Sequence, residues 1–148
     1  MVEEKCRKCG RERIDDVKEQ LCVWCATAIA ISQNPLAEGF RYNDCGVVLG
    51  CLYADIKEFS GEGNFEINYA KLLNGKYIYS VNIMLRSSGY GSYPSCYNQH
   101  YSSLEEITKI SYAEILDWIM RNSEAEKSKK MLHYLAEKLH TKPQLALF

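Results

Sequence analysis

The chain has 148 residues, of which 47% are hydrophobic and 25% are charged, and its formal net charge is −1. This composition is typical of a folded domain with a small appendage, and the near-neutral charge argues against a protein that holds duplex DNA by itself. No apolar run reaches transmembrane length, and the first residues, Met-Val-Glu-Glu-Lys, lack an apolar signal region, so we expect a cytoplasmic protein without a membrane partner.

The first predicted element is a zinc site formed by two C-x-x-C pairs. Cys6 and Cys9 form the first pair, and Cys22 and Cys25 form the second, with twelve residues between the pairs. Soft thiolates in a tetrahedron suit Zn²⁺, which contributes directly to the folding of a small unit. Seven cysteines, four of them in this spacing, are typical of a reducing compartment rather than of a disulfide framework. The alternative is that all four are buried thiols without a metal.

The residues around the pairs resemble a treble-clef zinc finger. Gly10 follows the first pair as in a knuckle turn, and the second pair opens an alanine-rich segment, residues 26–31, that favours helix. The resemblance covers residues 1–33 and implies one structural zinc ion but no task, because such fingers serve DNA binding, protein binding and nuclease scaffolds. Treble-clef nucleases use a histidine beside the metal, and this segment contains none.

Residues 34–142 are predicted to form an α+β domain, in which an antiparallel sheet of about three strands packs with C-terminal helices. Pro35 ends the finger helix, because the residue before proline is pushed out of the α region. Residues 34–43 are predicted to be a linker. The apolar residues 45–54 are predicted to form a central strand, and the turn-rich residues 59–64 a loop. Two cysteines in this part are interpreted as small core residues, Cys45 and Cys51.

Two further strands are predicted between Phe65 and Leu85, joined at Asn74-Gly75, which is a strong hairpin signal. Alternation along the second strand places five side chains on one face: Tyr77, Tyr79, Val81, Ile83 and Leu85. The first arm stays ambiguous, because residues 67–75 fit either a strand or a short helix that begins at Asn68 and ends at Gly75.

Residues 87–103 are rich in tyrosine, serine and glycine, and they are long for a loop, as in adaptable recognition surfaces. Four tyrosines either stack on unpaired bases, fill a partner's groove or pack back on the sheet as a lid: Tyr90, Tyr93, Tyr97 and Tyr101. Cys96 and His100 lie four apart, but nothing nearby in the sequence offers an orienting acid for a catalytic pair. With the strand before it and the helix start after it, this segment resembles units of small, uncharacterised phage and plasmid proteins, a likeness that implies no activity.

The rest of the domain is predicted to be helical. Capping boxes begin at Ser103 and Ser111, so residues 103–121 form either one helix or two that meet near Ser111. A third box at Ser123 is predicted to start the last helix, which buries one apolar stripe: Met131, Leu132, Leu135 and Leu139. Three lysines of this helix are interpreted as a solvated face rather than a nucleic-acid patch: Lys127, Lys129 and Lys130.

The sequence closes with Gln144-Leu-Ala-Leu-Phe148, after a Pro143 that stops the last helix. This pentapeptide resembles the motif by which bacterial proteins dock on the DNA polymerase sliding clamp: glutamine, an aliphatic residue, serine or aspartate, leucine and phenylalanine. Four residues match, and Ala146 departs at the tolerant third position: Gln144, Leu145, Leu147 and Phe148. The resemblance implies a flexible docking tail over residues 143–148 that lays apolar anchors into a preformed groove. The alternative is that its apolar side chains fold back onto the domain.

These patterns predict a non-enzymatic, zinc-containing accessory protein of bacterial or phage DNA replication or repair that docks on the sliding clamp. The alternative is a zinc-stabilised interaction or regulatory module of a phage or plasmid, with residues 87–103 as the binding surface. The sequence shows no carboxylate pair in a motif, nucleophile elbow, phosphate-binding glycine loop or histidine cluster, so we do not predict an enzyme. Charge gives little support for direct nucleic-acid binding, because residues 1–35 carry six basic and six acidic side chains.

Overall fold

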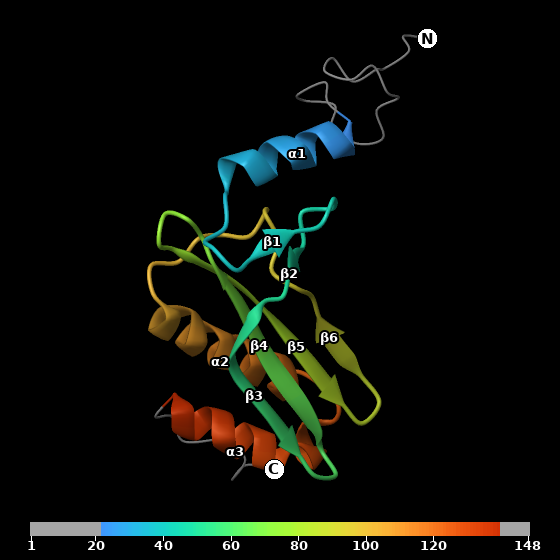
Figure 1. The fold of residues 1–148 in the computed structure, drawn as a ribbon. Coiled ribbons are helices and arrows are strands. Elements are labelled where there is room, and N and C mark those ends of the chain that lie inside the picture. Colours follow the sequence, from blue (N-terminus) through green and yellow to red (C-terminus); the bar gives the residue numbers. More distant parts are fainter. Residues whose placement is uncertain (1–21, 140–148) are drawn as a thin grey trace, which may run out of the picture.

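The structure is a computed structural model that describes residues 22–139 of the chain. Its elements in chain order are α1 Val23–Gln33, β1 Arg41–Tyr42, β2 Val48–Leu49, β3 Leu52–Phe59, β4 Gly63–Lys71, β5 Tyr77–Leu85, β6 Gly89–Gly91, α2 Leu104–Met120, the 3₁₀ turn η1 Ala125–Lys127 and α3 Lys129–Lys138 (Figure 1). The fold class is therefore α+β, as the sequence predicts. The helix predicted after the second C-x-x-C pair is α1, which ends at Gln33, two residues before Pro35.

The main sheet is antiparallel with the strand order β3-β4-β5-β6. Its centre is the predicted hairpin, in which β4 and β5 pair without interruption from Gly63 opposite Leu85 to Lys71 opposite Tyr77. Gly75 has a φ of 87°, a left-handed conformation that glycine adopts without strain. The helix alternative for residues 67–75 is therefore wrong, because the chain is extended until the turn begins.

Strand β3 is the outer strand on the other side of β4. Its pairing with β4 shifts register between Tyr53 and Asp55, which is a β-bulge. Three charged residues lie between the middle and the end of this strand: Asp55, Lys57 and Glu58. Among the described strands β3 is an outer one, and a bulge bends such a strand.

The segment 87–103 is not a loop throughout, because Gly89–Gly91 pairs with β5 and adds a fourth strand to the about three predicted. A Cβ atom on Gly91 would lie 2.0 Å from the side-chain oxygen of Asn82, so glycine permits the close approach of this strand. Periodicity missed β6 because three residues with two glycines carry no apolar alternation.

A smaller two-stranded sheet, β1 and β2, covers the end of the hairpin. It belongs to a second apolar cluster, formed by Val48, Ala70, Leu72 and Ile78 with Leu36, Phe40, Tyr42 and Cys51 packed around them. The linker prediction for residues 34–43 is thus wrong, since this segment packs onto the hairpin. The predicted strand 45–54 is divided at Gly50, where φ is 70°. Cys51 packs on the cluster as interpreted, whereas Cys45 is exposed.

Helix α2 is a single helix that passes through the buried Ser111 without a break. The predicted capping box begins it, with the Ser103 hydroxyl accepting the N–H of Glu106 at 3.1 Å. The box at Ser123 does not start the last helix, because it leads into η1 and α3 begins only at Lys129. The N-terminus of α3 is instead capped from the turn between β3 and β4. There the two carboxylate oxygens of Glu62 accept the N–H groups of Lys130 and Met131 at 3.0 Å each.

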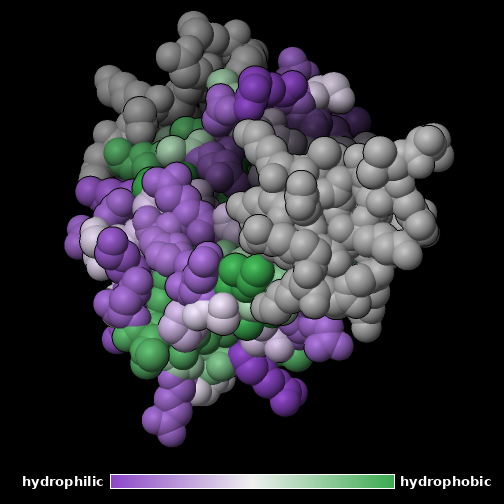
Figure 2. All heavy atoms as spheres, turned by 90° about the horizontal axis from the view of Figure 1, so that it is seen from above, coloured by the Kyte–Doolittle hydropathy of each residue, from purple (hydrophilic) through white to green (hydrophobic). Residues whose placement is uncertain are grey.

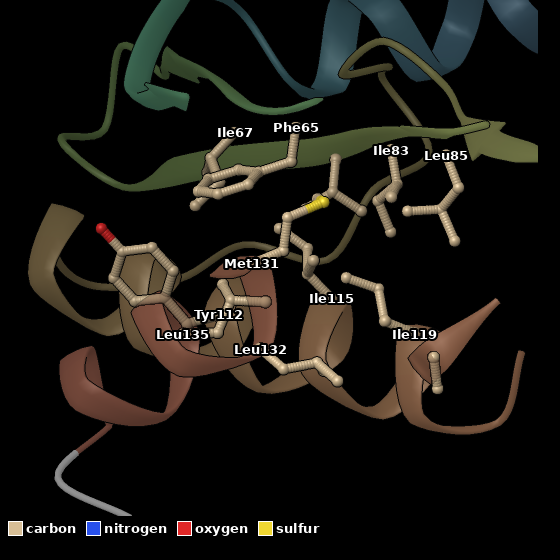
Figure 3. Packing of buried hydrophobic residues seen from close by; sticks show 12 residues of the cluster. Phe65, Ile67, Ile83, Leu85, Tyr112, Ile115, Ile119, Met131, Leu132 and Leu135 are labelled. Carbon is tan, nitrogen blue, oxygen red and sulfur yellow. The ribbon is translucent and has the colours of Figure 1, made fainter. Parts of the chain in front are cut away.

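Helices α2 and α3 cover one face of the main sheet, and the principal core lies between the two layers (Figures 1 and 3). Its sheet side includes Phe65, Ile67, Val81, Ile83 and Leu85, and its helix side includes Tyr112, Ile115, Ile119, Met131, Leu132 and Leu135. Burial of each large apolar side chain contributes about 1.5–3 kcal/mol. The apolar face predicted for β5 and the stripe predicted for α3 both contribute to this core. The lysines at 127, 129 and 130 are exposed, as predicted.

One carboxylate joins β3 to both helices. The Oδ2 atom of Asp55 accepts the hydroxyl of Tyr112 at 2.7 Å and that of Tyr134 at 2.6 Å. Burial, with the Asp55 hydrogen bond and charge, raises the pKa of Tyr134 to about 12. The two hydroxyls therefore remain neutral donors to Asp55 at neutral pH.

Candidate functional site

Two of the four predicted zinc ligands are described, Cys22 and Cys25, whereas Cys6 and Cys9 lie outside residues 22–139. Cys22 is the N-cap of α1, is 1% exposed, and its sulfur accepts the N–H of Cys25 at 3.4 Å. Cysteine sulfur atoms are ligands that Zn²⁺ prefers, so this half of the donor set suits Zn²⁺. Residues 22–139 hold no group of three or more potential ligands, so a complete set needs cysteines beyond this range.

Helix α1 is joined to the tyrosine-rich segment by polar contacts. The hydroxyl groups of Thr27 and Tyr97 lie 2.7 Å apart, and the Asn34 amide donates to the backbone oxygen of Cys96 at 3.3 Å. Cys96 is 4% exposed, and burial raises the pKa of its thiol. A buried thiol with a raised pKa is a poor nucleophile, so Cys96 serves packing at this joint.

The other predicted recognition tyrosines lie elsewhere. Tyr90 stacks on Trp118 with ring centroids 5.8 Å apart, and Tyr101 meets the ring of Tyr79 at 5.4 Å. Tyr93 is 57% exposed on the side of the sheet away from the helices. The four tyrosines therefore do not form one surface, because Tyr97 contacts α1, Tyr93 faces solvent and the remaining two frame a pocket.

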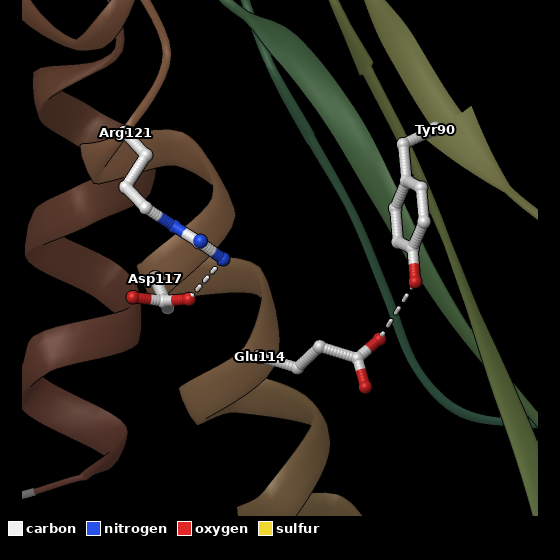
Figure 4. Close-up of polar contacts among 4 residues, drawn as sticks. All are labelled: Tyr90, Glu114, Asp117 and Arg121. Atoms are coloured by element: carbon white, nitrogen blue, oxygen red, sulfur yellow. Dashed lines mark hydrogen bonds and ion pairs between the residues drawn. The ribbon is translucent and has the colours of Figure 1, made fainter.

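That pocket, hereafter the Glu114 pocket, has a volume of about 190 Å³ and lies between β5, the segment 90–101 and α2. Its side chains include Tyr79, Tyr90, Ser92, Asn98, Gln99, Tyr101 and Glu114. The Glu114 carboxylate accepts the Tyr79 hydroxyl at 3.1 Å. At a longer 3.5 Å it also accepts the Tyr90 hydroxyl (Figure 4). Burial and the nearby Glu114 carboxylate raise the pKa of both hydroxyls. Sequence reasoning found the two loop tyrosines but missed Glu114, which no motif marks.

The second candidate surface is the open face, meaning the side of the main sheet that the helices leave uncovered. Alternation places Asn64, Glu66 and Asn68 of β4 here, next to Ser80, Asn82 and Met84 of β5. A hollow of about 420 Å³ is lined in part by Asn64, Glu66, Asn82, Met84 and Tyr93. An adjoining hollow of about 430 Å³ reaches Ile56 and Glu58 of β3. The open face thus combines amides, carboxylates and exposed apolar groups, a mixture suited to recognition.

Two amide groups on the open face are buried without a hydrogen-bond partner among the described residues, the Nδ2 atoms of Asn68 and Asn82. The sequence offered a signal for this face, because asparagine is depleted in strands and several asparagines lie inside β4 and β5.

Viewed from the α1 end of the molecule, hydrophobic residues lie in separate patches among hydrophilic ones (Figure 2).

The predicted clamp-binding residues lie outside the described range: Gln144, Leu145, Leu147 and Phe148. Within residues 22–139, no helix has the length and apolar character needed to cross a bilayer. In comparisons with known proteins, the chain matches no protein-family model, no curated protein and no solved structure.

Proposed function

We propose that this is a non-enzymatic, zinc-containing accessory protein of bacterial or phage DNA replication or repair, which docks on the DNA polymerase sliding clamp through residues 144–148. The observation that carries the proposal is the pentapeptide, in which four of five positions fit the docking motif. Leu147 and Phe148 supply apolar anchors for a groove, and Gln144 supplies a polar contact at its rim.

The sequence places the pentapeptide after Pro143, beyond the last helix. An apolar segment that follows a helix stop suits capture in the preformed groove of a partner. Met131, Leu132 and Leu135 of α3 are fully buried, and they form part of the principal core of the described residues.

In this proposal the α+β domain, residues 34–142, recognises a second molecule. A tethered domain acts at a high effective concentration near the site to which its tail is bound. The open face and the tyrosine-rich segment are two surfaces of this domain at which side chains, rather than strand edges, can contact a partner. Cys22 and Cys25, with Cys6 and Cys9, hold one structural zinc ion that stiffens the N-terminal unit.

The second candidate is an interaction module whose tail packs on its own domain. The exposure of Tyr93 beside the hollow over Glu66 and Asn82 favours it, because an exposed tyrosine beside amide groups is typical of binding surfaces. In this case removal of the tail lowers thermal stability substantially, as the loss of buried aromatic area does.

The test is binding to purified sliding clamp by size-exclusion chromatography or surface plasmon resonance. We expect the full chain to bind at tens of micromolar or below, and deletion of residues 144–148 or joint replacement of Leu147 and Phe148 by alanine to abolish binding. Ala146→Ser is the matched control, and it should bind at least as well, since it restores a residue of the motif.

Thermal unfolding separates the two candidates. A tail deletion that loses clamp binding without lowering the melting temperature supports docking. A full chain that does not bind the clamp at tens of micromolar contradicts docking, and a deletion that lowers the melting temperature strongly assigns the tail to the domain's own packing.

A further inference from the structure

The Glu114 carboxylate lacks a basic partner among the residues that the structure describes. The side chains around its pocket include no lysine, arginine or histidine. Arg121, at the end of α2, pairs with Asp117 instead (Figure 4). Among the described residues, Glu114 therefore accepts hydrogen bonds only from the hydroxyls of Tyr79 and Tyr90. A partly buried carboxylate without a basic partner attracts a positive charge.

The walls of the pocket are aromatic and held in place. The Tyr90 ring is stacked on Trp118 with an interplanar angle of 22°. Tyr101 is fixed by its edge contact with Tyr79 and by two backbone hydrogen bonds with Tyr77, each of 2.8 Å. Aromatic rings attract cations through their negative faces, and walls that are already ordered lose little entropy on binding.

The size of the pocket limits its ligand. A volume of about 190 Å³ admits the end of a linear molecule but not a folded domain or a nucleic-acid duplex. The side chain of Gln99 and the hydroxyl of Ser92 offer further oxygen atoms to N–H donors. We propose that the Glu114 pocket binds the alkyl ammonium or guanidinium end of a linear organic cation, supplied by a lysine or arginine side chain of a partner protein or by a free polyamine.

This inference is independent of clamp docking and gives the tyrosine-rich segment a ligand class. The test is a ¹H–¹⁵N NMR titration of the full chain with N-acetyl-lysine methylamide, N-acetyl-arginine methylamide and putrescine. N-acetyl-norleucine methylamide serves as the neutral analogue. We expect saturable shifts centred on Tyr90, Tyr101 and Glu114, with affinity for the neutral analogue lower by about tenfold or more.

Glu114→Gln keeps the shape of the side chain and removes its charge, so it should weaken cation binding by about tenfold or more. Asp117→Asn is the matched control, one turn along the same helix, and it should change affinity by less than about twofold, since Asp117 points to Arg121. Tyr90→Leu provides a second variant that keeps Glu114 and removes one wall, and we expect about fivefold weaker binding.

Equal binding of the neutral analogue, shifts that do not saturate, or unchanged affinity in a folded Glu114→Gln variant would each overturn the cation site. Tighter binding of the amino-acid derivatives assigns the site to a protein side chain, and tighter binding of putrescine assigns it to a polyamine; both support the site. The two proposals fail separately, because deletion of residues 144–148 should leave cation binding intact and Glu114→Gln should leave clamp binding intact.

Discussion

At the scale of single residues, two carboxylates each accept hydrogen bonds from two tyrosine hydroxyls. They are Asp55, on β3, and Glu114, on α2. Sequence patterns could not reveal these groups, because the partners of Asp55 lie 57 and 79 residues away. Local signals were readable: Cys22 opens a helix, and Ser103 caps one. A single sequence reveals the role of a residue when that role depends on positions close by in the sequence. It does not reveal a role that depends on contacts with distant positions.

The raised pKa of Tyr134 predicts a loss of stability at alkaline pH. Below the ordinary value of 10.0 the hydroxyl is protonated in both states, and its contribution is fully present. Between that value and about 12, the unfolded chain releases the proton while the folded chain keeps it, so the free energy of unfolding falls as pH rises. Urea unfolding across this range measures the slope.

Tyr134→Phe should make that slope shallower, because one of the tyrosine hydroxyls with a raised pKa is then absent. Tyr93→Phe, at an exposed position, controls for the loss of a tyrosine hydroxyl as such. Identical slopes in Tyr134→Phe and in the unaltered chain would show that another group controls alkaline unfolding.

At the scale of elements, the sequence predicted those whose signal is local and periodic. The hairpin at Asn74-Gly75, helix α1 and helix α2 follow from turn residues, a proline stop and a capping box. The missed or misplaced elements include strand β6 and the start of α3, and both have a physical reason. Strand β6 depends on glycine allowing a close approach to Asn82, and α3 begins where Glu62 supplies acceptors from another element.

The Glu62 cap predicts a specific loss of stability. Glu62→Ala removes both acceptors of the N–H groups at the start of α3, as well as a negative charge at the positive end of the helix. We expect the free energy of unfolding to fall by about 1 kcal/mol, measured by urea denaturation.

Glu58→Ala is the control for that experiment, because Glu58 is an exposed carboxylate at the end of β3 near the same turn. Its effect should be within about 0.5 kcal/mol of zero, as for surface positions in general. Equal losses in the two variants would mean that net charge, rather than the cap, stabilises α3.

At the scale of the whole molecule, the predicted domain boundary after residue 33 does not coincide with a gap in contacts. Helix α1 reaches the body through Thr27 and Tyr97 and through Asn34 and the Cys96 backbone. The boundaries at 33 and 142, the zinc ion and the docking tail remain predictions from sequence. The α+β class is the large-scale property that sequence reasoning obtained correctly, because it depends on the sum of many local patterns.

The zinc site predicts about one zinc ion per chain by elemental analysis. Removal by a strong chelator should disturb the NMR signals of α1 and of Tyr97, while those of β4, β5 and the principal core persist. The contact between Thr27 and Tyr97 is the reason that the disturbance should reach the tyrosine-rich segment.

Cys22→Ser should reduce the zinc content to near zero, because three thiolates hold the ion far less tightly than four. Cys45→Ser is the matched control, since Cys45 is exposed and belongs to neither C-x-x-C pair. A chain without zinc, or an equal loss in both variants, would refute the site.

The bulge and the charged residues of β3 are expected to hinder pairing between copies of this protein through this strand. An outer strand with free N–H and C=O groups is a template for another chain, and a bulge followed by the exposed Lys57 and Glu58 makes it a poor one. At the opposite margin, β6 is three residues long, too short to seed a continuous ladder across molecules. Crowded copies should therefore resist joining through their main chains, a route that leads toward fibrils.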